Sequence, residues 1–137
     1  MIRLVKKKIK FLILLTQFCI INADAINNTE LALHHFMQGE FLMNQGNYAL
    51  AILEFQDAIE LDPNASTIHV SIADGYRRLG KGKRAEDHLQ IALDLEPEEK
   101  EAREMLGQLY LTQKKYKDAQ NIYKELNRSF PENLDYI

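Results

Sequence analysis

A proline that recurs at a fixed interval constrains the fold of this chain more than any other feature. Pro63, Pro97 and Pro131 are evenly spaced, with no insertion in either interval. Each proline closes a similar stretch, and the three stretches begin at Ala51, Ala85 and Ala119. Self-similarity at a fixed period of about 34 residues is typical of stacked repeats, in which each unit buries its apolar face against its neighbours. The sequence therefore predicts a solenoid rather than a single closed core.

Apolar residues recur at helical spacing on both sides of a turn in each unit. From Ala32 the spacing predicts a helix up to a turn signal at residues 45–47, after a short polar lead over residues 26–31. A second helix is expected from about Tyr48, and Pro63 ends it because proline cannot continue a helix. The fold class is therefore all-α, with two antiparallel helices in each unit. The predicted division of the chain is 1–25 (leader), 26–31 (lead), 32–65, 66–99 and 100–133 (three units), and 134–137 (C-terminal stub).

Small and large residues alternate at equivalent places in the three units, as in closely packed helices. The small ones are Gly39, Ala73, Gly107, Ala51, Ala85 and Ala119, and the large ones are Leu42, Tyr76, Tyr110, Phe55, Leu89 and Tyr123. With Ala58, Ala92 and the closing prolines, this pattern resembles the tetratricopeptide repeat family over residues 32–133. The resemblance implies a right-handed superhelix, an alpha-solenoid of three helix-turn-helix repeats. His35, His69 and Arg103 depart from it, because they stand where the family favours tryptophan.

The resemblance also implies a concave groove formed by the first helix of each unit. Carried over by position, the partner-binding residues are Phe36, Glu40, Met43, Val70, Asp74, Arg77, Arg78, Glu104, Gln108 and Leu111. Methionine and phenylalanine adapt to irregular side chains, and the mixture with charged residues suits an extended or helical peptide. The expected partner is therefore a protein or peptide.

One ligand of the family is excluded by charge. The family's clamp of lysines, asparagines and arginine, which holds the terminal carboxylate of chaperone tails, falls here on Phe36, Glu40, Ser71, Glu101 and Met105. None of these residues is a cation, and the two carboxylates would repel an acidic tail. We therefore expect a different kind of peptide.

Candidate catalytic and metal-binding residues lack the patterns that such chemistry needs. The histidines are His34, His35, His69 and His88. No two of them lie four residues apart on one predicted helix, and the single cysteine, Cys19, lies in the leader. His35 and His69 occupy equivalent places where an aromatic ring packs, and no serine lies in the strand-turn-helix context of a nucleophile. The sequence predicts no enzyme, no cofactor and no metal site.

Residues 1–25 have the layout of a secretory signal peptide. Their basic residues are Arg3, Lys6, Lys7, Lys8 and Lys10. An apolar run over residues 11–21 follows, with small residues at Ala23 and Ala25 before a possible cleavage site. The run is shorter than the roughly 20 residues of a transmembrane helix. We expect export to the periplasm or the medium, in a bacterial envelope, without stable membrane insertion after cleavage. The remaining body is acidic, which argues against nucleic-acid binding.

The last unit lacks a capping helix in this sequence, so Ile122, Tyr123 and Leu126 are expected to be partly uncovered. Self-association through this end, a fragment of a longer repeat protein, and a frayed end are the three explanations. The predicted function is an exported scaffold or adaptor that binds a partner in its groove, during envelope assembly or secretion. The alternative is an N-terminal interaction module of a larger protein, or an accessory subunit of an enzyme.

Overall fold

The computed structural model describes residues 27–131, and this part of the chain consists of helices joined by short turns. The N-terminal helix covers residues 27–44, and it is followed by α2 (Tyr48–Leu61), α3 (Ser66–Arg78), α4 (Gly82–Leu95), α5 (Lys100–Thr112) and α6 (Tyr116–Ser129). The all-α prediction is confirmed. The predicted leader and stub lie outside the described residues. No helix of residues 27–131 combines the length and apolar character needed to cross a membrane.

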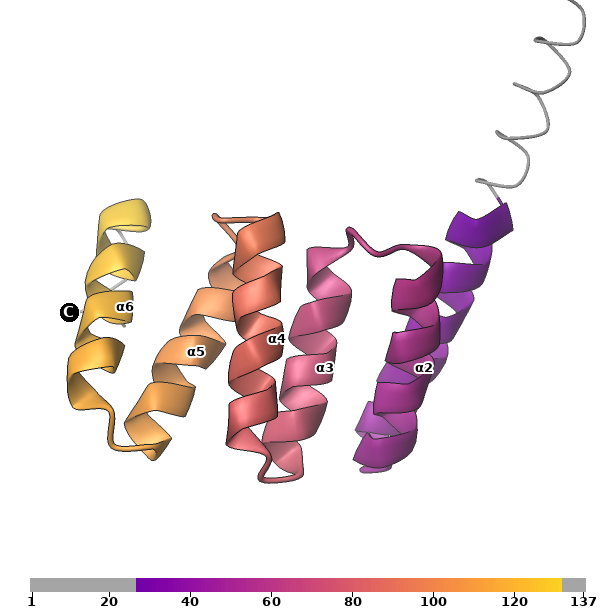
Figure 1. The fold of residues 1–137 in the computed structure, drawn as a ribbon, viewed down its shortest axis with the longest axis horizontal. Helices are drawn as coiled ribbons and strands as arrows, with labels where there is room; N and C mark the ends of the chain where they lie inside the picture. Colours follow the sequence, from indigo (N-terminus) through magenta and orange to yellow (C-terminus); the bar gives the residue numbers. More distant parts are fainter. Residues whose placement is uncertain (1–26, 132–137) are drawn as a thin grey trace, which may run out of the picture.

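The helices stand side by side in chain order and form an open row rather than a closed bundle (Figure 1). Each of the helices α2 to α5 packs on the next one along the chain, and α3 also contacts α5. Contacts between α3 and α5, the first helices of the second and third units, leave α4 on the opposite side of the row. This layered order is the alpha-solenoid of helix pairs that the repeat predicts.

The turn inside each unit is built in the same way three times. Gly46, Gly80 and Lys114 occupy equivalent places and all have a positive φ, of 78°, 70° and 59°. The next residue then donates its backbone N–H to the carbonyl oxygen five residues earlier, as in the bond from Lys81 N to Tyr76 O at 2.8 Å. This geometry satisfies the last carbonyls of the first helix. Glycine adopts it without steric cost, whereas Lys114 adopts a conformation that costs a side chain about 1 kcal/mol or more.

Small residues lie at the places where paired helices approach most closely, as the sequence predicts. All six small residues, three of glycine or alanine on the first helices and three alanines on the second, are buried. Gly39 faces the ring of Phe55, and a Cβ built on Gly39 would lie 2.6 Å from Cδ1 of that ring. The largest fully buried side chains are Phe55, Ile72, Leu89 and Leu126. The core therefore combines buried small residues with large side chains, and in the first unit the large ring of Phe55 packs directly on Gly39.

Residues 27–31, predicted as a polar lead, are helical in the structure. Asn27, Asn28 and Thr29 favour helix caps, but in a helix interior each costs only about 0.5 kcal/mol relative to alanine. An extended helix satisfies the backbone N–H and C=O groups of these residues, which outweighs that cost. The predicted start at Ala32 is therefore wrong.

Leu126 is fully buried, although the sequence predicts that the open end leaves it partly uncovered. Ala119 and Leu126 are two turns apart on α6 and share the face that is buried, and α5 is the element against which α6 packs. Ile122 and Tyr123, which lie between them along the helix, are half-buried as expected. The apolar stripe of α6 is therefore directed into its own unit more than toward a following one.

Candidate binding groove

A cavity of about 750 Å³ opens on the side of the solenoid formed by the first helices. It is lined by Phe36, Glu40, Met43, Asn44, Gln45, Gly46, Tyr48, Thr67, Val70, Ser71, Asp74, Arg78, Glu101 and Met105. These residues come from all three units: from the N-terminal helix and its turn, from α3 and from α5, with Tyr48 added by α2. We call this cavity the groove.

Six of the ten residues predicted to bind a partner line the groove. They are Phe36, Glu40, Met43, Val70, Asp74 and Arg78. Arg77 and Gln108 line a separate cavity of about 510 Å³ near the turn at Gly80. Glu104 and Leu111 line neither cavity; the Glu104 carboxylate lies 3.5 Å from Lys100 Nζ, and Leu111 is 45% exposed. The predicted role of all ten in partner binding stays a prediction.

All five places of the chaperone-tail clamp also line the groove, although none of them carries a positive charge in this chain. They are Phe36, Glu40, Ser71, Glu101 and Met105. The five side chains at these positions therefore lie in one cavity, as they must if a single ligand is to contact all of them. The groove also includes Thr67, Tyr48 and the turn residues Gln45 and Gly46, which the sequence reasoning missed. Thr67 could have been predicted from the repeat, because it occupies in the second unit the place that Glu101 occupies in the third.

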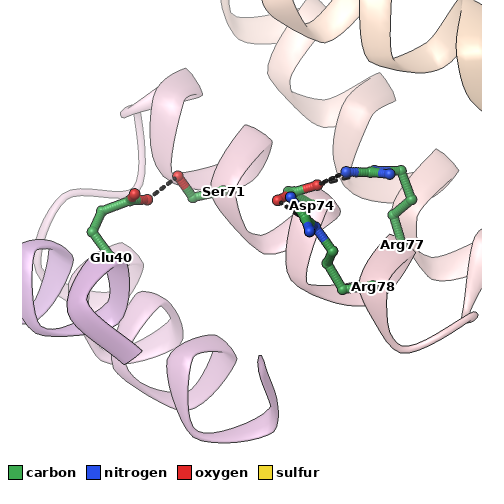
Figure 2. A network of polar contacts seen from close by, with 5 residues as sticks. All are labelled: Glu40, Ser71, Asp74, Arg77 and Arg78. Carbon is green, nitrogen blue, oxygen red and sulfur yellow. Dashed lines mark hydrogen bonds and ion pairs between the residues drawn. The ribbon is translucent and has the colours of Figure 1, made fainter. Parts of the chain in front are cut away.

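A network of polar contacts ties the groove residues of the first two units together (Figure 2). Ser71 Oγ donates to Glu40 Oε1 at 2.8 Å and so links α3 to the N-terminal helix. Asp74 lies between two guanidinium groups (Figure 2), and it accepts from Arg77 Nε at 2.9 Å and from Arg78 Nε at 3.4 Å. These contacts hold the polar wall of the groove in place before any partner arrives. A prearranged site loses less conformational freedom on binding.

The electrostatic environment of the groove is negative around Glu101. Burial raises the pKa of the Glu101 carboxyl, and the negative charges of Glu99, Asp74, Glu104 and Glu40 raise it further. Carboxylates of the first and second units, those of Glu40 and Asp74, thus act on Glu101 of the third unit. The groove is suited to a ligand that brings positive charge.

Two histidine clusters lie outside the groove. His35 Nδ1 lies 2.8 Å from Glu54 Oε2 and joins the N-terminal helix to α2, and Asp57 stands close enough for the three to offer ligand atoms within 4.8 Å of one another. Sequence reasoning missed this group because its members come from two helices. His69 Nδ1 and His88 Nδ1 lie 3.1 Å apart between α3 and α4. Both clusters join the two helices of one unit, which is a packing role.

Burial lowers the pKa of both His69 and His88, and the neighbouring His69 lowers the pKa of His88 further. One Nδ1 must donate and the other accept, so the contact requires at least one neutral ring. The ring of Tyr76 lies against His88, with centroids 5.6 Å apart. The place where the family favours tryptophan is therefore filled in the second unit by stacked aromatic rings.

Two sequence profiles described as tetratricopeptide repeat match this chain, over residues 28–65 and 70–133. Together they cover well over half of the chain. The chain belongs to the tetratricopeptide repeat family.

Known proteins with similar sequence or structure agree with this assignment. The DnaJ homolog subfamily C member 3 of Bos taurus is 29% identical over 113 residues, which are 82% of this chain and 21% of that protein. The chain thus spans about a fifth of the length of this curated relative. The first TPR domain of Spaghetti (RPAP3), solved with the HSP90 peptide SRMEEVD, superposes with a TM-score of 0.74 at 24% identity, over 79% of this chain and 86% of that one. The Arabidopsis OM64 TPR domain gives a TM-score of 0.74 at 18% identity, over 80% and 90%. These likenesses show the fold.

Proposed function

We propose that this protein is a non-catalytic scaffold that binds a peptide or an extended segment of a protein partner in the groove. The observation that carries the proposal is the cavity itself, which is lined by side chains from all three units of a repeat fold. A ligand that contacts three units at once must be elongated, because the first helices stand in a row. The walls of the groove combine apolar and charged side chains, which is the composition of a peptide-binding site.

The peptide in the similar Spaghetti domain is acidic at its end, as its sequence SRMEEVD shows. In this chain the places that would meet such a tail include Glu40 and Glu101 and no cation. Like charges repel most strongly where solvent is partly excluded. We therefore propose a peptide partner that is not an acidic chaperone tail.

A role in envelope assembly or secretion of a bacterium is the finer part of the proposal. It is supported by the sequence of the leader, with its basic start, apolar run and small residues before Ile26. N-terminal sequencing of the mature protein checks it: export with cleavage predicts a start at about Ile26, and retention of Met1 contradicts it. The alternative, a module of a longer protein or an accessory subunit, is supported by the small share of the bovine relative that the chain spans.

Self-association remains a proposal as well, and the exposed side chains indicate which end favours it. In the third unit, α6 keeps Leu126 buried and exposes Tyr116 to 65%. The N-terminal helix and α2 expose more apolar surface, at Leu31, Leu33, Met37, Phe41, Leu50 and Leu53, with exposed fractions of 42–63%. Exposed apolar patches of this kind mark association surfaces. Association through apolar surface is therefore favoured at the N-terminal end over the predicted C-terminal one.

The groove is tested by affinity capture with a variant that changes it on two helices. Phe36→Ala removes an apolar wall, and Asp74→Lys places a cation beside Arg77 and Arg78. We expect the double variant, folded by circular dichroism, to lose the partners that the wild-type chain captures. A matched control changes α4 away from the groove, at the exposed Ile91 (to Ala) and Asp94 (to Lys), and should capture normally. Equal capture by both double variants would exclude the groove as the binding site.

A further inference from the structure

The groove contains carboxylates whose charge is not balanced by the protein. Glu40, Asp74 and Glu101, one from each unit, line it against a single guanidinium, that of Arg78. Asp74 is paired with Arg77 and Arg78. Within the part of the chain that the structure describes, no ion pair involves Glu40 or Glu101. Glu40 accepts the hydrogen bond from Ser71, but neither carboxylate is paired with a cation among the described residues, so both can pair with a positively charged ligand.

The negative charge of Glu40 acts on Glu101 although the two residues belong to the first and the third unit. The N-terminal helix supplies one and the first turn of α5 supplies the other, so the stacking of the three units brings them to one cavity. The carboxylate of Asp74 lies within range of the same group. A cation between these side chains would relieve repulsion that the free protein retains.

Apolar side chains stand beside the carboxylates. Phe36, Met43, Val70 and Met105 line the same cavity. The ring of Phe36 is held by the buried Phe55, with centroids 5.7 Å apart, and Val70 is only 4% exposed. Lysine and arginine carry a charge at the end of an apolar stem, so one side chain of this kind can pack on the apolar wall and reach a carboxylate. Neither an acidic nor a purely apolar segment uses both features.

We propose that the groove selects a basic peptide segment, in which a lysine or arginine pairs with Glu40 and Glu101 while its stem and the neighbouring apolar side chains pack on Phe36 and the groove methionines. This proposal rests on the proposed peptide-binding function and specifies the charge of the partner. It is opposite in sign to the acidic peptide in the Spaghetti complex. Charge complementarity of this kind determines which partners bind and how fast they associate.

Selection from a displayed library of random peptides tests the charge preference even though the natural partner is unidentified. The bait is the full chain, and the comparison bait carries Glu40→Lys and Glu101→Lys. The control bait, Glu60→Lys with Glu125→Lys, has the same change in net charge on exposed residues outside the groove. We expect lysine and arginine to be enriched with the wild type and the control, and aspartate and glutamate to be enriched with the groove variant.

Affinity measurements on one selected peptide then assign the effect to the groove. Replacing its lysines by glutamine should weaken binding by about tenfold, a loss of about 1.4 kcal/mol. Glu40→Gln with Glu101→Gln should cause a similar loss for the lysine peptide and little for the glutamine peptide. Added salt should weaken only the lysine peptide, since screening acts on the charge pairing.

The outcomes separate the two proposals. Peptides that bind and are weakened by Phe36→Ala, but show no basic enrichment, would overturn the charge preference and leave the peptide-binding function standing. Unchanged enrichment of basic residues with the Glu40→Lys, Glu101→Lys bait would also overturn the charge preference, because the basic peptides would then bind to another part of the protein. A library that yields no binder dependent on the groove would overturn both.

Discussion

The first and third units have the same arrangement of helices but differ in how completely the equivalent aromatic side chain is buried. In the first unit, Phe55 is fully buried and its ring fills the space over Gly39. In the third unit, the equivalent aromatic residue Tyr123 is half-buried over Gly107. The outer surfaces differ in the opposite sense, since the first unit exposes several large apolar residues and α6 exposes mainly polar ones. The position of a residue in the repeat thus specifies whether its side chain faces inward. The size of the side chain and its neighbours decide how much of its surface is buried.

Removal of the equivalent aromatic side chains should give the largest difference between the two units. We expect Phe55→Ala to lower the free energy of unfolding by about 3–5 kcal/mol, because a fully buried ring leaves a cavity. Tyr123→Ala should cost about 1–2 kcal/mol, since its side chain is already partly exposed to solvent. Urea denaturation of both variants measures the difference. Equal losses of unfolding free energy would mean that the two aromatic side chains are equally well buried in solution.

Substitution of the equivalent glycines should give a smaller difference of the same sign. Gly39→Ala places a Cβ 2.6 Å from the Phe55 ring, which is buried and cannot move away, so we expect a net loss of about 1–2 kcal/mol after the gain in helix propensity. Gly107→Ala places a Cβ 3.0 Å from Tyr123 Cζ, and that half-buried ring can shift. The second variant should be close to neutral. Thermal unfolding of the pair decides the matter, and a Gly39→Ala protein as stable as the wild type would show that the first unit tolerates overpacking.

The smallest effect is expected from pH, and it concerns the middle unit. At the equivalent place, His35 contacts the carboxylate of Glu54 and Arg103 contacts that of Glu98, whereas His69 contacts His88. Only the middle unit thus pairs two groups that become positive together in acid. The two outer units should be less sensitive to protonation at this place.

The folded pKa of both His69 and His88 is lowered from 6.5, so the unfolded chain binds protons more readily. The stability that this pair contributes is therefore present above about pH 6.5 and lost as the pH falls below it. His69→Phe should reduce the loss of stability between about pH 7.5 and pH 5.5. His34→Phe, a change at an exposed ring, serves as the control. Denaturation midpoints with the same pH dependence in both variants would contradict this assignment.

The periodic pattern was enough to predict the helices and the contacts inside each unit. Proline at the end of the second helix and small residues such as Ala51 and Ala85 act locally or between sequence neighbours, so their effect can be read from spacing. The predicted start at Ala32 failed because cap preferences are weaker than continued backbone hydrogen bonding. The burial of Leu126 was missed because a repeat pattern does not give the rotation of a terminal helix.

The groove was predicted less completely than the fold. All three predicted residues of the N-terminal helix, Phe36, Glu40 and Met43, line the cavity. On α3, Val70, Asp74 and Arg78 line it and Arg77 does not. On α5 the predicted partner-binding residues were Glu104, Gln108 and Leu111, while the two α5 residues that line the cavity, Glu101 and Met105, were predicted only as clamp positions. Successive residues of a helix point about 100° apart, so the rotation of α5 decides which of its side chains reach the cavity. Such a rotation depends on packing with the neighbouring unit.

By itself, the sequence determined the repeat, the all-α solenoid and the absence of cations at the chaperone-clamp positions. These features depend on residue type and on the constant spacing of the repeat. Only the tertiary structure decided that the charges of Glu40 and Asp74 act on Glu101, and that Asp74 alone of the three is paired with arginines. Distances between units follow from the angle at which helices stack, and that angle results from the packing of many side chains at once.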